Sequence, residues 1–215
     1  MKKTIVTRSA NDKLYSLAKS LWRDDNTFVR LQQFTGFHGA LTYLLHILEN
    51  YNGIIVNADE DFFVTNEDLI DQVIADMVRN DFAYCGVPDK GVISHRDKSF
   101  FHVNPFFNVF NVDMIKTKLP KFDNSKVYDY ANQCEKNGNV DEPFAGLFYW
   151  LHLNFKHANF TKITSTDGIS TVININDKPI GIHSWYSREY GKDVKQTERI
   201  DKCLEWAIIN RNQTN

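Results

Sequence analysis

Two aspartates separated by one residue follow an apolar run, and their side chains are well suited to chemistry. The run 54–56, Ile-Ile-Val, continues through Asn-Ala into Asp59, Glu60 and Asp61. If the extended geometry persists, alternate side chains point the same way, so both carboxylates can face a single cation. Two negative charges at the edge of an apolar sheet repel each other and lose solvation unless a cation or donors compensate. The pair therefore indicates either a divalent-cation site or a solvated acidic loop.

The elements around this pair alternate between strand and helix patterns. A β-branched run at 4–7 precedes helical periodicity over 14–22, and a strand-like run at 28–34 precedes a helix that ends near residue 50. After the acids, Thr65 and Asp68 resemble a capping box for the next helix, and 82–87 has the pattern of a strand. This order predicts a mostly parallel sheet with helices on both faces and ligand sites at the carboxyl ends of its strands.

The second half of the chain is less regular. The patterns indicate strands near 106–112 and 170–175, helices near 128–136 and 142–153, and a C-terminal helix over about 194–209. There is no internal repeat or long polar linker. We therefore expect one α/β domain, residues 1–215, whose second half adds to the same sheet.

Composition limits the classes of function. Lys and Arg total 25 against 27 Asp and Glu, so no global positive field favours nucleic acid as a partner. Cys85, Cys134 and Cys203 are far apart and form no CxxC pair, which fits a reducing, cytoplasmic setting better than a disulfide framework. The N-terminus turns polar before an apolar segment forms, and the longest apolar stretch falls short of the about 20 residues of a membrane span. We expect no secretory or transmembrane segment.

The segment 38–63, HGALTYLLHILENYNGIIVNADEDFF, resembles the core of the GT-A glycosyltransferases: a glycine-containing loop, a helix and a hydrophobic strand that ends in Asp-x-Asp. The resemblance is specific over about 4–90 and extends to the element order of the whole chain. It implies a single GT-A-type, Rossmann-like domain with a nucleotide-binding half, 1–90, and an acceptor-side half, 91–215. The implied activity is of hexosyltransferase type, from a nucleoside diphosphate sugar, most commonly a UDP sugar, to a hydroxyl acceptor such as a glycan.

The resemblance also implies roles for residues of the first half. Asp61 would bind Mn²⁺ or Mg²⁺ at the donor diphosphate, and Asp59 would contact the ribose or donor sugar and help to hold the metal. The nucleotide of such enzymes lies at the end of the first strand, here Thr7, Arg8 and Ser9. Arg8 would meet a phosphate and Thr7 or Ser9 the base or ribose, although Arg8 is equally consistent with a surface charge in a turn.

The loop 35–39 precedes a helix, and its two glycines, Gly36 and Gly39, permit close approach of the backbone to a base or phosphate. The dispersed glycines and asparagine that are common in the corresponding loop of the largest GT-A group are only partly matched. The donor sugar and the subfamily therefore stay open.

The resemblance to GT-A glycosyltransferases also implies two further sites in the second half of the chain. Inverting GT-A enzymes usually have an acid at the start of a helix below the acceptor, where this chain has Asp141 and Glu142, with Glu142 preferred as general base. Acids are also common there because they complement the helix dipole. His183 matches a late histidine that completes the metal site or touches the diphosphate, and the alternative is a histidine packed in the core.

Other classes of protein share parts of this pattern. An Asp-x-Asp after a hydrophobic strand also resembles the nucleophile motif of haloacid-dehalogenase-type phosphatases, but that motif normally opens the fold. Sugar nucleotidylyltransferases are disfavoured because their glycine-rich N-terminal signature is missing. A nucleotide-sugar-binding module without catalysis is the third alternative, against which Asp59, Asp61 and His183 argue.

Overall fold

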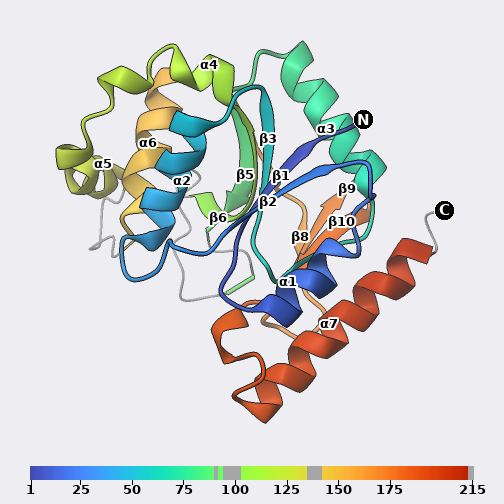
Figure 1. Cartoon of the computed structure of the whole chain (residues 1–215). Coiled ribbons are helices and arrows are strands. Elements are labelled where there is room, and N and C mark those ends of the chain that lie inside the picture. The colour runs from blue at the N-terminus through green and yellow to red at the C-terminus, as the bar shows by residue number, and fades with distance from the viewer. Residues whose placement is uncertain (90–91, 94–102, 135–141, 213–215) are drawn as a thin grey trace.

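A mostly parallel sheet forms the centre of the molecule (Figure 1). The computed structural model describes residues 1–89, 92–93, 103–134 and 142–212. Within them the main sheet has six strands in the order β2-β1-β3-β6-β5-β7, namely β1 (Thr4–Arg8), β2 (Thr27–Leu31), β3 (Ile54–Ala58), β5 (Tyr84–Pro88), β6 (Val103–Asn111) and β7 (His157–Asn159). Only β6 among them runs antiparallel to its neighbours. The predicted fold class, a mostly parallel sheet flanked by helices, is confirmed.

The central strands β1 and β3 are buried on both faces, which explains their largely apolar sequences. Ile5 and Val56 face one hydrophobic cluster, and their neighbours Val6 and Ile55 face another, as the alternation of a strand requires. The first cluster includes side chains of α1 (Asp12–Lys19), α3 (Glu67–Arg79) and α7 (Val194–Asn212). The second includes side chains of α2 (Gly39–Asn50), α4 (Val112–Lys116), α5 (Val127–Cys134) and α6 (Phe144–Asn154).

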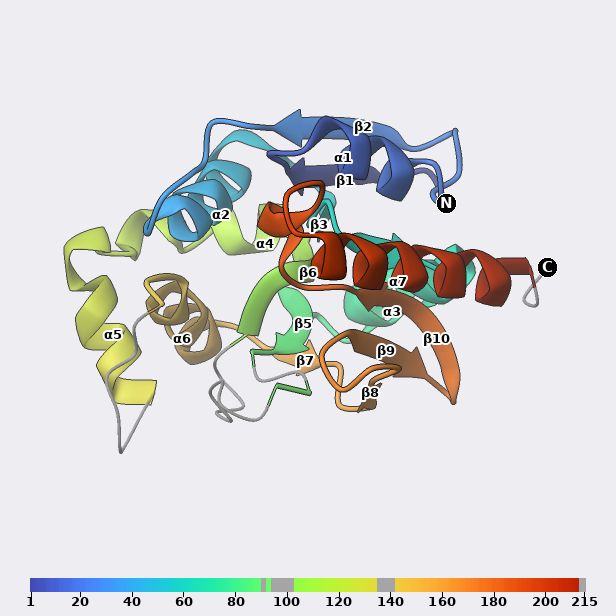
Figure 2. The same ribbon diagram turned by 90° about the horizontal axis from the view of Figure 1, so that it is seen from below.

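A second, smaller sheet packs on the side of α3 and α7 (Figure 2). Its order is β4-β10-β9-β8, with β4 (Phe62–Val64), β8 (Ile163–Thr164), β9 (Thr171–Ile175) and β10 (Lys178–His183). The expectation that the strand near 170–175 joins the main sheet is therefore wrong. The reason is β4, which follows the acidic turn, pairs antiparallel with β10 and shares the hydrophobic cluster of α3 and α7.

Asparagines cap the starts of α1 and α3. Asn11 caps α1 by accepting from the backbone N–H of Leu14, and Asn66 caps α3 by accepting from that of Leu69. The expected capping box at Thr65 is thus displaced by one residue, because the Thr65 hydroxyl donates to the Pro179 carbonyl at 2.6 Å. None of the helices in the described ranges is long and apolar enough to cross a lipid bilayer.

Candidate metal centre

Asp59 and Asp61 lie in a tight turn between β3 and β4. The backbone N–H of Phe62 donates to the Asp59 carbonyl at 3.0 Å, and that of Asp59 donates to the Phe106 carbonyl of β6 at 2.8 Å. The extended geometry expected for the pair therefore ends at Ala58. The two carboxylates converge because the chain reverses here, and the neighbouring strand fixes where the reversal begins.

The pairing of β4 with β10 brings His183 to this turn. His183 lies opposite Phe62 in the antiparallel register, one position from Asp61. Its Nε2 is 3.2 Å from Asp61 Oδ1, and its ring stacks on Phe106 with centroids 4.0 Å apart. Asp59, Asp61 and His183 each offer a ligand atom, and these atoms lie within 4.8 Å of one another. The three residues proposed from sequence as metal ligands are thus together in space.

The two carboxylates have different electrostatic surroundings. Arg8 Nη2 lies 3.3 Å from Asp59 Oδ2 at the carboxyl end of β1. Burial raises the pKa of Asp59, and the charge of Arg8 opposes that rise. Burial also acts to raise the pKa of Asp61, but His183 and the hydroxyl of Ser184 outweigh it, so this pKa lies below its ordinary value. Asp61 is therefore the more strongly stabilised anion.

Donor atoms in this cluster fit a divalent cation. Asp59 Oδ1 and His183 Nδ1 are buried and have no hydrogen-bond partner among the described residues. A buried carboxylate oxygen without a partner is costly, and a bound cation would remove that cost. Two carboxylates with an imidazole suit Mn²⁺ well, whereas Mg²⁺ prefers oxygen ligands alone. Asp59, Asp61 and His183 are the residues that would hold the ion.

Glu60, between the two aspartates, anchors the connection between β1 and α1. Its Oε2 accepts from the Ser9 hydroxyl at 2.7 Å and from the backbone N–H groups of Ala10 and Asn11 at 2.9 and 2.8 Å. Sequence reasoning missed this role, and the acidic character of the middle residue was the available signal. The hydroxyl of Ser9, expected to meet the nucleotide, is thus already bonded within the protein.

The other residues expected at the nucleotide lie at the same edge of the sheet. Thr7 is buried and shares a small hollow with Asp59. Gly36 adopts a φ of +78°, and a Cβ on Gly39 would lie 2.9 Å from the Phe34 carbonyl oxygen. Both glycines are therefore required by the loop itself, which follows the carboxyl end of β2.

Glu142, the preferred candidate for the general base, is not part of the acidic cluster. Glu142 precedes Pro143, the N-cap of α6, and its carbonyl accepts from the backbone N–H of Ala145 at 3.0 Å. Among the described residues, the group that could hold a metal contains Asp59, Asp61 and His183 but not Glu142. Asp141 lies outside the described residues.

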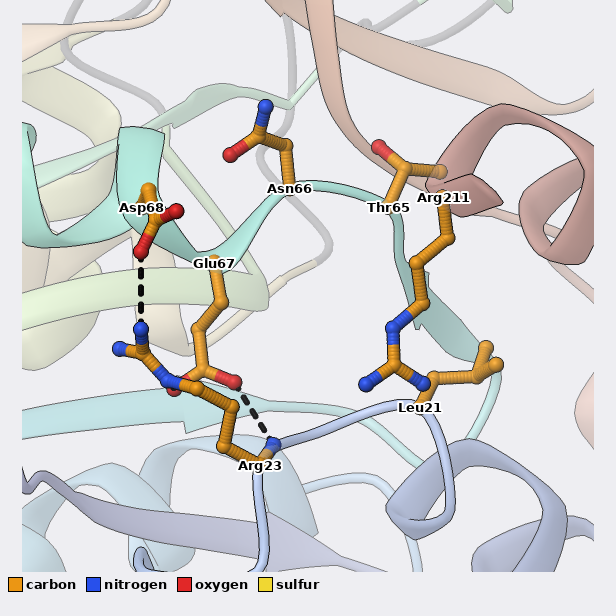
Figure 3. Close-up of a pocket in the computed structure, with 7 residues that line it drawn as sticks. All are labelled: Leu21, Arg23, Thr65, Asn66, Glu67, Asp68 and Arg211. Carbon is orange, nitrogen blue, oxygen red and sulfur yellow. Dashed lines mark hydrogen bonds and ion pairs between the residues drawn. The ribbon is translucent and has the colours of Figure 1, made fainter. Parts of the chain in front are cut away.

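A cavity of about 70 Å³ lies elsewhere, at the N-terminal start of α3 (Figure 3). Arg23 donates through its backbone N–H to Glu67 and through its guanidinium to Asp68, both at 2.8 Å. Glu67 also pairs with Lys3, which precedes β1, so the cavity is at the amino edge of the sheet. The acidic turn is at the carboxyl edge. Beside this cavity Arg23 pairs with Glu67 and Asp68, and Arg211 donates to the Ser20 carbonyl at 3.4 Å.

Comparison with known proteins gives likeness of fold alone. No family model and no curated protein matches the chain. The glycosyltransferase GlyE of Streptococcus pneumoniae TIGR4 is similar with a TM-score of 0.48 and 10% identity, over 75% of this chain and 45% of GlyE. A glycosyltransferase involved in glycosylation of the major capsid of PBCV-1 has a TM-score of 0.43 and 9% identity, over 74% of this chain and 81% of that one. A197 from STIV has a TM-score of 0.44 and 12% identity, over 84% and 94%.

Two of these three structures are glycosyltransferases, the class that the sequence resemblance named. This chain spans less than half the length of GlyE. All three TM-scores are below 0.5, so the likeness concerns the general fold and not the residues of the acidic turn.

Proposed function

We propose that this chain is a metal-dependent glycosyltransferase that moves a sugar from a nucleoside diphosphate sugar to a hydroxyl acceptor such as a glycan. The observation that carries the proposal is the convergence of Asp59, Asp61 and His183 at the carboxyl edge of a mostly parallel sheet, with Asp59 Oδ1 buried and unpartnered in the described structure. Open α/β sheets bind ligands at this edge.

The chemistry needs stabilisation of a leaving group of high negative charge. When bound, Mn²⁺ or Mg²⁺ would neutralise charge on the departing nucleoside diphosphate. Arg8 is proposed to donate to a phosphate oxygen, and its part-buried guanidinium 3.3 Å from Asp59 supports this role. Thr7 and the loop with Gly36 and Gly39 lie at the same edge and are assigned to the base or ribose, with UDP as the nucleotide to test first.

The acceptor side is assigned to residues 91–215. Glu142, with Asp141 as the alternative, is proposed as the general base that removes the proton of the acceptor hydroxyl. The base would act on the face of the sugar opposite the leaving diphosphate, which gives inversion at the anomeric carbon. The position of Glu142 directly before Pro143, the N-cap of α6, supports this assignment, because the resemblance implies an acid at a helix start as the base of inverting enzymes.

Donor turnover tests the proposal directly. The protein should release nucleoside diphosphate from at least one member of a panel of UDP, GDP, CDP and dTDP sugars, in the presence of Mn²⁺ and not of a chelator. Asp61→Asn should abolish this release, while Asp76→Asn, an exposed acid on α3, should leave it unchanged. Hydrolysis of a phosphomonoester that is lost in Asp59→Asn, with no turnover of any sugar nucleotide, would contradict the proposal and support a phosphatase.

A further inference from the structure

The chain immediately after His183 has an unfavourable backbone conformation. Trp185 and Tyr186 have φ angles of +62° and +61°, the left-handed region that large side chains rarely adopt. Two such residues in succession are retained only where surrounding contacts hold them. The turn begins two residues after the proposed ligand His183. Contacts that hold the turn therefore also fix the position of His183.

Arg199 of α7 supplies such contacts. Its Nη1 donates to the Ser184 carbonyl at 2.5 Å, and its Nη2 donates to the Trp185 carbonyl at 2.8 Å. Its Nε donates to the side chain of Gln196, one turn earlier in α7, at 2.9 Å. The guanidinium is mostly buried, with 14% of the side chain exposed, and it lies 3.5 Å from Asp167. A planar fork with several donors suits this task, whereas a lysine has a single nitrogen.

The residues that Arg199 holds are bonded to the acidic turn. The backbone N–H of Ser184 donates to the Asp61 carbonyl at 3.0 Å, and the Ser184 hydroxyl donates to Asp61 Oδ2 at 3.2 Å. The ring of Trp185 lies 4.5 Å from that of His183, and its indole N–H donates to Thr171 at 2.9 Å. Each carbonyl bound by Arg199 thus belongs to a residue that contacts Asp61 or His183.

We propose that Arg199 is a positioning residue of the metal centre. By binding the carbonyls of Ser184 and Trp185 it stabilises the left-handed turn, which fixes the direction of His183 and Ser184 toward Asp61. Helix α7 is thereby coupled to the proposed metal site. The proposal rests on the proposed function of the Asp59, Asp61 and His183 cluster as a metal site.

The test measures Mn²⁺ affinity of the full chain by the loss of the free-ion electron paramagnetic resonance signal, without nucleotide. Arg199→Ala should weaken Mn²⁺ binding by about 10- to 100-fold, the usual effect of removing a partner outside the direct ligands. Lys202→Ala, an exposed position almost one turn further along α7, is the matched control and should bind as wild type. Arg199→Lys, which keeps the charge but not the fork, should have an intermediate affinity and serves if the alanine variant fails to fold.

A second readout needs no metal. The indole N–H resonance of Trp185, identified by its loss in Trp185→Phe, should shift in Arg199→Ala and stay in place in Lys202→Ala. Wild-type Mn²⁺ affinity together with an unshifted indole resonance in a folded Arg199 variant would overturn the positioning role. Absence of Mn²⁺ binding by the wild-type protein would instead overturn the metal site itself, and the indole resonance would then decide whether Arg199 holds the turn.

Discussion

At the scale of single residues, the two aspartates of the acidic turn differ in their hydrogen-bond partners. Asp61 is fully enclosed and already bonded to His183 and Ser184, whereas Asp59 keeps one buried oxygen without a partner in the described structure and faces Arg8. Asp61 is thus held in place by bonds within the protein. Asp59 is paired with Arg8, whose guanidinium could instead donate to a phosphate oxygen.

Replacing Asp61 by Asn tests its role as a ligand. The change removes a negative charge and a ligand oxygen while keeping the volume, so Mn²⁺ affinity should fall by more than the about 10- to 100-fold that indirect partners cost. Isothermal titration with Mn²⁺ measures this, and Asp76→Asn on the exposed face of α3 is the control. An Asp61→Asn protein that binds Mn²⁺ as tightly as wild type would contradict the assignment.

Replacing Glu142 by Gln separates catalysis from binding. If Glu142 is the general base, turnover should fall by roughly 100-fold or more while the dissociation constant of the nucleotide stays unchanged. Steady-state kinetics and calorimetry on the same preparation give both quantities. Unchanged turnover in both Glu142→Gln and Asp141→Asn would show that neither acid is the base, and a product of retained configuration would have the same meaning.

At the scale of elements, local patterns predicted the parts of the fold that repeat. Buried strands appear as continuous apolar runs, as at 54–56, and helices as residues with a period of 3.6. The pairing of β4 with β10 was not predicted because the two strands are far apart in the sequence. The flanking residues Asp61 and Ser184, which this pairing brings into contact, are 123 residues apart. His183 was proposed from the sequence because it resembles a late histidine of the family. Its contact with Asp61 depends on the register of these two strands, which only the structure gives.

A buried polar contact ties α2 to the strands that present the site. The Tyr43 hydroxyl donates to Asn57 Oδ1 at 2.6 Å and lies 3.1 Å from the Val6 carbonyl, and Asn57 donates in turn to Asn108 at 3.0 Å. These amides lie inside the sheet, so the interior is ordered by polar bonds as well as by apolar packing.

Tyr43→Phe tests this contact. It leaves the buried Asn57 oxygen without its donor and should lower the free energy of unfolding by about 1–3 kcal/mol. Urea denaturation followed by circular dichroism measures the loss. Tyr128→Phe, at an exposed position of α5, should change stability little. Equal stabilities for the two variants would mean that the Tyr43 bond contributes nothing net.

At the scale of the whole molecule, the two edges of the main sheet carry different groups of charged residues. The carboxyl edge holds the acidic turn, and the amino edge holds a network in which buried Lys3 pairs with Glu67 at 2.7 Å and Asp71 at 2.6 Å. Arg23 joins both acids. Burial acts to raise the pKa of Glu67 and of Asp71, but their bonds to Lys3 and Arg23 outweigh it and lower both.

Stability should therefore depend on pH through this network. Because the folded pKa values of Glu67 and Asp71 lie below their unfolded values of about 4.3 and 3.9, their contribution is complete above about pH 5 and is lost as the pH falls through the folded values. The double variant Glu67→Gln, Asp71→Asn should be less stable at pH 7 and should lose less stability between about pH 5 and 3. Denaturation across that window measures both effects. The exposed pair Asp24→Asn, Asp25→Asn is the control, and a wild-type slope in the network variant would be the contrary result.

We propose that the acidic turn binds a cation and a nucleoside diphosphate together. Calorimetric titration of the full chain with UDP, GDP, CDP and dTDP, each with and without Mn²⁺, tests it most directly. We predict that at least one nucleotide, UDP first, binds in the presence of Mn²⁺ and loses that binding when Mn²⁺ is withheld or when Asp61 is replaced by Asn. Failure of all four nucleotides to bind with Mn²⁺ present would contradict this joint binding.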